Sequence, residues 1–241
     1  MCGRFALSKL PAELIEEFEI HTGKTMPILP ADWNIAPTRD IFIIRNDSDN
    51  QRDLAIASWG IIAPWSHDRA TAVKSQAQAI NARSETVHEK PTFRSAFRNR
   101  RCLIPADGYY EWATEMGPYA PRQPFYISKG PKRTLAMAGI WDRWIAPTGE
   151  IVETAAIITR PAVDFLATVH SRMPTFLPVD RWDRWLDRSL QEVVEIRGLM
   201  ELSDPAAELE AIPVAPLVNS IRNNGPQLIE PIELGEPETL F

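Results

Sequence analysis

The sequence predicts a single α+β domain, with a largely antiparallel mixed sheet or a barrel-like β core and helices at its periphery. Two observations favour this class. Most β-rich runs follow one another without a helical segment between them, which is typical of antiparallel pairing. The 21 prolines among 241 residues are scattered and do not gather in a linker, which indicates many ordered loops within one unit.

A first helix is predicted over 11–20, because Pro11 suits a first turn and Leu14, Ile15 and Phe18 fall on one face. Three more helices are expected farther along the chain, the last with Ser189 as its cap. They span 162–170, 179–187 and 189–199. Runs rich in β-branched and aromatic residues predict the strands. These lie at 40–45, 53–62, 101–105, 108–112, 124–128, 134–141, 151–158 and 212–218.

Composition limits the class of protein. The chain is 44% hydrophobic and 24% charged, which fits one globular domain with a sizeable core. No apolar run approaches the roughly 18 residues of a membrane span, and the start lacks the layout of a secretory signal. We therefore expect a cytoplasmic protein without a membrane partner. Cys2 and Cys102 are expected to be free thiols, the second of them in the core.

The net charge of −6 argues against a protein that coats nucleic acid with its whole surface. The charge is nevertheless uneven, since residues 81–105 carry six basic and two acidic side chains. From residue 201 onward, one arginine stands against eight acidic residues. The basic stretch is either a local anion-binding face or a solvated arginine-rich helix.

Cys2 is the centre of the predicted chemistry. A residue this small after Met1 allows removal of the initiator methionine, which leaves Cys2 with a free α-amine beside its thiol. The amine has a reference pKa of about 8 against about 10.4 for lysine, so far more of it is free base at neutral pH. Such an aminothiol condenses with an aldehyde to a Schiff base, and the thiol then closes a thiazolidine ring. The alternative is that Cys2 is an arbitrary second residue.

Three further residues stand in unusual surroundings: Asn81, Glu111 and His170. In the strand at 108–112, Tyr109 and Glu111 share one face, and Tyr110 and Trp112 take the other. Glu111 is therefore either a surface residue of an edge strand or an acid with a raised pKa in an apolar pocket. His170 precedes a segment that Pro174 prevents from continuing a helix, and it is either structural or catalytic.

Taken together, six segments resemble the SOS response-associated peptidase (SRAP) family of abasic-site processing proteins. They occur in the family's order from residue 1 to about 220. The segments are Met-Cys-Gly-Arg-Phe at 1–5, Trp-Asn-Ile-Ala-Pro-Thr at 33–38, Trp-Gly at 59–60 followed by Pro-Trp at 64–65, Asn-Ala-Arg-Ser-Glu-Thr at 81–86, Ile-Pro-Ala-Asp-Gly-Tyr-Tyr-Glu-Trp at 104–112 and His-Ser-Arg-Met-Pro at 170–174.

The resemblance implies covalent capture of abasic sites in single-stranded DNA during the DNA damage response. It assigns the nucleophile to Cys2, the residue that holds the adduct to Asn81, and proton transfer to Glu111 and His170. It also implies a lyase-like activity and autoproteolytic removal of Met1. By the same resemblance, the DNA contacts are Arg4, Arg83 and Arg172 for phosphates, with Pro37 and Trp65 stacking on or wedging between bases at the lesion. The alternative for Trp65, one of eight tryptophans, is a position in the core. Ser171 departs from the family, in which an acidic residue is usual at this position.

The resemblance implies an SRAP-like domain over 1–225, followed by an acidic tail over 226–241. We expect a monomer that lies in the cytoplasm and is nucleoid-associated when bound to DNA. The four histidines are far apart in the sequence and neither cysteine has another nearby, so no metal and no cofactor are expected.

Two other functions are also compatible with the sequence. A cysteine N-terminal-nucleophile hydrolase, either an autoprocessing peptidase or a glutaminase, also uses Cys2 but needs an acyl electrophile. A non-covalent module that binds modified DNA does not need the thiol. Substitution of Cys2 by alanine separates binding from covalent capture.

Overall fold

The structure is a computed structural model that describes residues 2–21, 28–113, 122–131 and 133–234. Its larger sheet contains a closed ring of five strands in the order β10-β4-β3-β6-β9, because β9 also pairs with β10. All of these pairs are antiparallel except β10 with β4. The barrel-like core expected from the sequence is therefore present. Its strands are β3 (Asp40–Asn46), β4 (Arg52–Trp59), β6 (Arg101–Ala106), β9 (Leu135–Ile145) and β10 (Ile151–Pro161).

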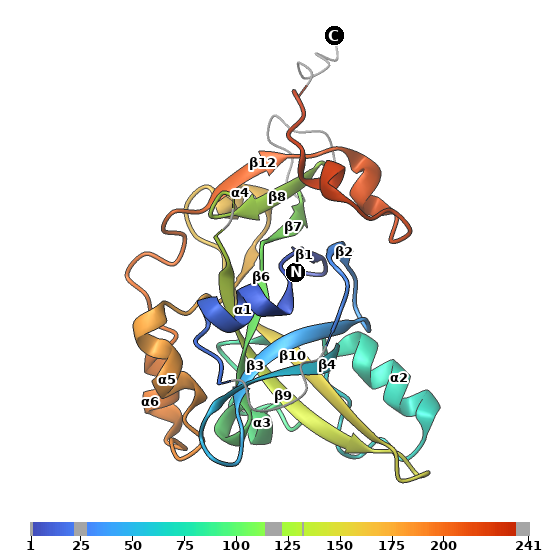
Figure 1. The fold of residues 1–241 in the computed structure, drawn as a ribbon, viewed down its shortest axis with the longest axis vertical. Helices are drawn as coiled ribbons and strands as arrows, with labels where there is room; N and C mark the ends of the chain where they lie inside the picture. Colours follow the sequence, from blue (N-terminus) through green and yellow to red (C-terminus); the bar gives the residue numbers. More distant parts are fainter. Residues whose placement is uncertain (1, 22–27, 114–121, 132, 235–241) are drawn as a thin grey trace.

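A second sheet has the strand order β12-β8-β7-β1-β2 and is wholly antiparallel. Figure 1 shows β1 in the middle of the molecule, between β7 and the closed ring. The segment that follows Cys2 is thus the part of the smaller sheet that lies toward the closed ring. The strands are β1 (Phe5–Leu7), β2 (Asp32–Ile35), β7 (Gly108–Trp112), β8 (Pro124–Ser128) and β12 (Glu210–Pro213).

Two short strands extend the larger sheet along β10. β5 (Asn81–Arg83) pairs with β10 in parallel, and β11 (Arg172–Pro174) pairs with it in antiparallel fashion. Thr159 lies opposite Arg83 in one pair and Pro174 in the other. The motifs around residues 81 and 172, which are far apart in the sequence, therefore flank the same end of one strand.

The helices are short and lie outside the sheets. In Figure 1, α2 lies on one side of the larger sheet and α5 and α6 on the other. The α-helices are α1 (Pro11–Glu17), α2 (Arg69–Gln78), α3 (Arg94–Asn99), α4 (Leu166–Val169), α5 (Trp182–Leu186) and α6 (Val193–Gly198). Further 3₁₀ turns occupy Val179–Arg181, Pro216–Asn219 and Pro226–Ile229. Among the described residues, no helix is long and apolar enough to cross a bilayer.

The structure confirms the α+β class and corrects several elements. The bounds predicted for β7 and β8 are those observed, but the helix expected over 162–170 is only Leu166–Val169. Ser189 caps no helix, because its hydroxyl bonds to Asp187 Oδ1 at 2.6 Å and α6 begins only at Val193. The strand expected over 212–218 is Glu210–Pro213 and gives way to a 3₁₀ turn. β1, β2, β5, β11 and α2 were not predicted, and a helix at α3 was only one of the two alternatives for the basic stretch.

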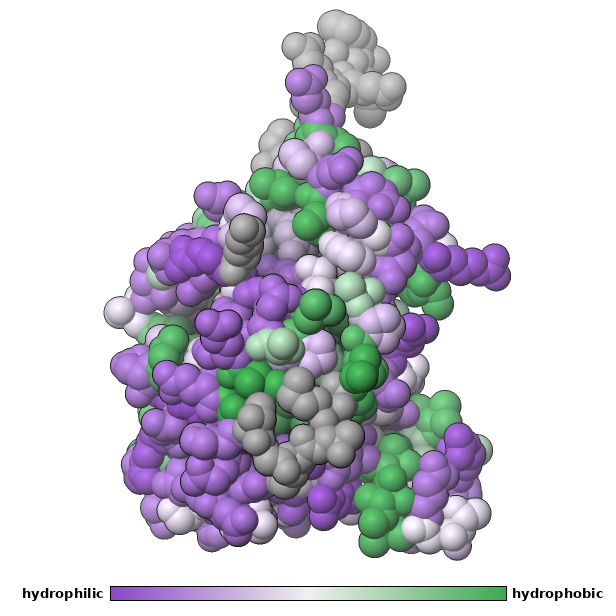
Figure 2. All heavy atoms as spheres, in the orientation of Figure 1, coloured by the Kyte–Doolittle hydropathy of each residue, from purple (hydrophilic) through white to green (hydrophobic). Residues whose placement is uncertain are grey.

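The two faces of β7 contact different cores, as its alternation predicts. Tyr109 belongs to the large core with Cys2, whereas Tyr110 packs with Tyr126 in a smaller cluster on the opposite face. Hydrophilic side chains cover most of the face seen in Figure 2, with a hydrophobic group beside the tip of the β9–β10 hairpin. Ile145 and Ile151 pair at that tip and are 67% and 61% exposed.

The predicted boundary at residue 225 stays a prediction. Leu228 is buried and the backbone N–H of Ile232 donates to Pro213 O at 3.0 Å, so residues just after that boundary contact the smaller sheet. Residues 235–241 of the predicted acidic tail lie outside the described residues.

Candidate functional site

Cys2 is completely buried and lies just before β1, next to the centre of the smaller sheet. Phe5 is paired with Tyr109, and Arg4 O accepts a hydrogen bond from the Tyr110 N–H at 2.9 Å. This register brings the start of the chain alongside β7, the strand that carries Glu111.

Asn81 joins the larger sheet to this N-terminal segment. It begins β5, and its Nδ2 donates to Cys2 O at 2.7 Å. Its Oδ1 is buried and has no hydrogen-bond partner among the described residues. Asn81 therefore fixes the Cys2 backbone and presents one acceptor for a further donor.

Glu111 lies in the interior and not on a surface edge, which settles the alternative that the sequence leaves open. The residue is only 3% exposed, and burial raises the pKa of its carboxyl group to about 7. Burial also raises the pKa of the Cys2 thiol far above its usual range, and the nearby Glu111 charge raises it further. The buried thiol is therefore protonated at neutral pH, beside a carboxyl group that exchanges a proton in that range.

His170 ends α4 and faces the same carboxyl group. Its Nδ1 lies 3.9 Å from Glu111 Oε1 and accepts a hydrogen bond from the Arg172 backbone N–H at 2.9 Å. Burial lowers the pKa of the imidazole below its usual value, so the neutral ring predominates at pH 7. Because Nδ1 acts as an acceptor, the proton of the neutral ring is on Nε2.

Tyr109 is a member of this cluster that sequence reasoning did not select. Its side chain is buried and its phenol pKa is raised, mainly by burial and then by the charges of Cys2 and Glu111. The alternation of β7 already placed Tyr109 on the face of Glu111. That signal was sufficient to find it, but nothing in the sequence indicated which face contacts Cys2.

The four predicted catalytic residues thus meet between the two sheets, and comparisons with known proteins agree with the motifs that selected them. The sequence profile described as SOS response associated peptidase (SRAP) matches residues 1–221. The chain belongs to the SRAP family. A relative from Bacillus subtilis, "Abasic site processing protein YoqW", is 36% identical over 230 residues, which are 95% of this chain and 99% of that protein.

Other relatives extend the comparison beyond bacteria. "Abasic site processing protein HMCES" of Gallus gallus is 34% identical over 217 residues, which span 81% of this chain and 62% of that protein. Among solved structures, a protein from Bacteroides thetaiotaomicron superposes with a TM-score of 0.83 at 26% identity, covering 96% of this chain and 100% of the other. The SRAP fold is therefore shared by chains that differ at most positions.

The DNA contacts expected from the SRAP resemblance fall into two groups in the structure. Trp65 is 52% exposed, Arg83 is exposed at the end of β5, and Pro37 is half-buried after β2. The Arg83 guanidinium makes no hydrogen bond or ion pair with the described residues. These three side chains are open to a ligand.

Arg4 and Arg172 are instead already bound within the protein. Arg4 Nη1 donates to Asn34 Oδ1 at 2.7 Å and to Val218 O at 2.8 Å. Arg172 Nη2 donates to Thr159 O at 2.6 Å, and its guanidinium pairs with the Glu85 carboxylate in a bidentate contact. This contact, with Arg172 as hydrogen-bond donor, lowers the pKa of Glu85 to about 2.

The basic stretch near residue 100 also contains both exposed arginines and an arginine that is bound within the protein. Arg94 and Arg98 are exposed on α3, whereas Arg101 is 3% exposed and donates to backbone carbonyl groups that include Trp185 O and Leu190 O. Arg101 therefore supports the fold. Cys102 is buried and free, as predicted.

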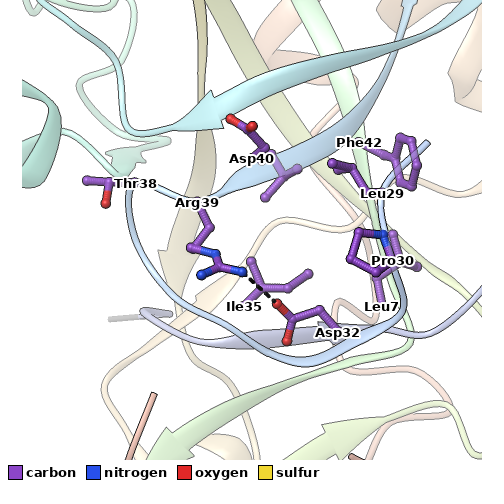
Figure 3. A pocket seen from close by; sticks show the side chains of 10 residues that line it. Leu7, Leu29, Pro30, Asp32, Ile35, Thr38, Arg39, Asp40 and Phe42 are labelled. Carbon is purple, nitrogen blue, oxygen red and sulfur yellow. Dashed lines mark ion pairs between the residues drawn. The ribbon is translucent and has the colours of Figure 1, made fainter. Parts of the chain in front are cut away.

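A separate cavity of about 290 Å³ lies between β1, β2 and β3. Figure 3 shows Arg39 and Asp32 facing each other on one side of it, with Leu7 and Phe42 on the other. The Arg39 and Asp32 side chains are 3.9 Å apart. None of the four predicted catalytic residues lines this cavity, so the chemistry is not expected there. Within the described ranges, no group of three or more metal-ligating side chains is present.

Proposed function

We propose that this chain processes abasic sites in single-stranded DNA by forming a covalent thiazolidine through Cys2, after removal of Met1. Met1 itself lies outside the described residues. One observation carries the proposal: Glu111, with a pKa raised to about 7, lies beside the buried thiol of Cys2 and within 3.9 Å of His170. The family membership and the names of the relatives support the choice of substrate.

The first step opens the abasic sugar. A closed deoxyribose at an abasic site is a hemiacetal, and release of its aldehyde requires a proton for the departing ring oxygen. His170 is suited to donate it in its protonated form, from Nε2, because Nδ1 lies against the Arg172 backbone. The neutral imidazole that remains and the ionised form of Glu111 are the bases: Glu111 accepts the proton of the C1′ hydroxyl as the carbonyl group forms, so one proton is given and one is taken and the ring opens without a net change in protons.

The second step forms the covalent bonds. The Cys2 α-amine adds to the aldehyde carbon and water leaves, which gives an imine. The Cys2 sulfur then adds to the imine carbon, its proton passes to the nitrogen, and the five-membered ring closes. Glu111 accepts and returns these protons, since a carboxyl group with a pKa of about 7 can do both at neutral pH. Asn81 holds the Cys2 carbonyl so that the amine and thiol keep one orientation.

Binding of the single-stranded DNA requires only a small part of the protein surface. Arg83 is the exposed phosphate contact, and Pro37 and Trp65 supply apolar surfaces for the neighbouring bases. Arg172 reaches a phosphate only in exchange for, or in addition to, its contact with Glu85. We further propose that the protein acts as a monomer at the nucleoid, and that the same Glu111 and His170 assist removal of Met1.

Intact-mass spectrometry tests the proposal. The purified protein is incubated with a single-stranded oligonucleotide that carries one abasic site, or with the same strand carrying a tetrahydrofuran analogue that has no aldehyde. We expect loss of the Met1 mass and a stable adduct only with the true abasic site. A stable adduct from Cys2→Ala would overturn the thiazolidine, and undiminished binding without any adduct would favour a non-covalent module.

The hydrolase alternative uses the same nucleophile on an acyl group. It predicts turnover of an amide, such as glutamine or a peptide other than the chain's own Met1, and no adduct with an aldehyde. An amidase assay beside the mass measurement therefore separates the two.

A further inference from the structure

Tyr109 is a buried residue of β7 that has no role in the proposed reaction steps. It is 1% exposed and stands two residues before Glu111, so both side chains project from the same face of the strand. It belongs to the large core cluster that contains Cys2, and its partner across β1 is Phe5, three residues after Cys2. The Tyr109 side chain is therefore placed among the groups that carry the proposed reaction.

The ring of Tyr109 packs in a layer of aromatic side chains. The Phe176 ring lies 6.1 Å from it, measured between ring centroids. Phe5, the cross-strand neighbour of Tyr109, packs its ring edge-on against Trp59 at a centroid distance of 5.1 Å. Because a phenol oxygen lies on the axis of its ring, packing of the ring also fixes the position of the hydroxyl group.

The hydroxyl group of Tyr109 makes no hydrogen bond with any of the described residues, although a buried phenol normally has a partner. Tyr110, the next residue, shows the normal case, because its hydroxyl donates to Trp33 O at 2.7 Å. Phenylalanine at position 109 would fill the same space without burying an unpaired polar group. A ligand that accepts a hydrogen bond accounts for the hydroxyl at this position.

The Tyr109 phenol is a hydrogen-bond donor at neutral pH. Burial raises its pKa well above the usual value, and the charges of Cys2 and Glu111 raise that pKa further. The phenol therefore stays protonated, so that it can donate a hydrogen bond but does not act as a base. Since both charges act on it and neither residue bonds to it, the hydroxyl lies near the reacting groups and is open to the atom that reacts with them.

We propose that the Tyr109 hydroxyl is a further catalytic group, which donates a hydrogen bond to the C1′ oxygen when the Cys2 amine adds to the aldehyde. In this step the bond between nitrogen and C1′ forms, and the π electron pair of the carbonyl group moves to the oxygen. The phenol stabilises the negative charge that develops there and keeps its own proton. Glu111 carries to this oxygen the two protons that the amine loses, and the oxygen leaves as water. This inference rests on the proposed function, to which it adds a stabilising group for the addition step.

Tyr109→Phe removes only this hydroxyl and is the test, with single-turnover adduct formation by the full chain followed by intact mass. We expect a rate about 10²- to 10³-fold below that of the wild type, both with abasic single-stranded DNA and with a simple aldehyde, because both undergo the addition step. Affinity for the strand with the tetrahydrofuran analogue should not change, because the analogue has no hydroxyl oxygen at C1′. The melting temperature should equal or exceed that of the wild type, because an unpaired buried hydroxyl is lost.

Tyr126→Phe is the matched control, because it removes a hydroxyl on the opposite face of the smaller sheet, where Tyr126 packs with Tyr110. It should form the adduct at the wild-type rate. Three results would overturn the role of the Tyr109 hydroxyl: a wild-type rate in Tyr109→Phe, equal slowing in both variants, or a loss of affinity for the tetrahydrofuran strand as large as the loss of rate. If the wild type forms no adduct, the proposed function and this inference are both refuted, whereas an adduct that forms equally fast in Tyr109→Phe refutes only the inference.

Discussion

A buried carboxyl group whose charge acts on a buried thiol defines this site at the scale of single residues. An ordinary glutamate has a pKa near 4.5 and is fully ionised at pH 7, whereas that of Glu111 is raised to about 7. The folded protein therefore carries a mixture of protonated and ionised Glu111 under physiological conditions. This property suits proton transfer in both directions and also affects stability.

The first prediction concerns stability against pH. The pKa of Glu111 is higher in the folded than in the unfolded protein. The contribution of Glu111 to the free energy of unfolding is therefore present in full below about pH 4.5 and is lost as the pH rises through about 7. The loss is at most about 3 kcal/mol in the free energy of unfolding. Urea unfolding between pH 5 and 8 should show that Glu111→Gln gains stability relative to the wild type as the pH rises. The exposed Glu192→Gln serves as control, and parallel curves for both variants would contradict the prediction.

The second prediction separates the two proton carriers by substrate. His170→Ala should lose rate mainly with closed-ring abasic DNA, and should recover much of it with a simple aldehyde that needs no ring opening. Glu111→Gln should slow adduct formation with both substrates, by about 10²- to 10⁴-fold. Single-turnover adduct formation, followed by gel shift and by mass, measures both rates. Equal losses for both variants on both substrates would refute this division of roles.

How far the sequence determined the site differs from residue to residue. The resemblance selected Cys2, Asn81, Glu111 and His170, and the structure places them together. The residue pattern alone left Glu111 open between a surface and an interior position, because alternation along one strand does not identify which face is covered. The hydrogen-bond partner of Arg4 could not be predicted from the sequence either, because Val218 is 214 residues away along the chain.

At the scale of secondary structure, β7 is the element that positions the site, and its first residue limits how it packs. A Cβ atom at Gly108 would lie 2.4 Å from the Tyr126 ring and 2.7 Å from Ile127 O on β8. Because one of these neighbours is backbone, β7 and β8 would have to separate. Glycine here permits the close approach of the two strands.

The third prediction follows from this approach. Gly108→Ala should lower the free energy of unfolding by about 2–4 kcal/mol, as overpacking in a core does. Gly198→Ala in α6 is the control, and it should be neutral or slightly stabilising. Apart from its chain neighbours and the backbone of its own helix, no heavy atom of the described residues lies within 4 Å of the position that its Cβ would take. Thermal unfolding of both variants measures the difference. Equal melting temperatures for the two variants would show that β7 and β8 can separate without loss of stability.

The elements that the sequence did not reveal share a physical cause. β5 and β11 have three residues each, too few to establish an alternating pattern, and both depend on pairing with β10. α2 combines alanine with polar residues and buries only Ala72 and Gln76, so it lacks an apolar stripe. Ser189 bonds to Asp187 and not to the helix that follows, a choice that depends on local geometry.

At the scale of the whole molecule, the N-terminal segment is joined to a segment about 200 residues farther along the chain. Arg4 bonds to Val218 O, and the buried Asn34 side chain donates to Ser220 O and Asn223 O at 2.9 and 2.8 Å. We call residues 216–224 the C-terminal strap. The strap closes over the smaller sheet and holds the segment that carries Cys2.

The fourth prediction tests the strap. Asn34→Ala removes hydrogen bonds to two strap carbonyl groups and to Arg4, and should lower the free energy of unfolding by about 2–4 kcal/mol. It should also slow adduct formation at temperatures at which the variant is fully folded, because Arg4 then loses a fixed position. Rates and circular dichroism measured at one temperature well below the unfolding transition report the two effects. If the variant is folded but less stable and forms the adduct at the wild-type rate, the strap stabilises the fold and has no effect on the proposed reaction.

The contact between Arg4 and Val218 has a consequence for the order of events during synthesis. Cys2, the proposed nucleophile, is synthesised long before the strap to which Arg4 bonds. Until residues 216–224 have been made, Arg4 lacks its contact with Val218 O. If the proposed removal of Met1 requires Arg4 in its folded position, that removal follows synthesis of the strap, and a shorter nascent fragment does not expose the aminothiol.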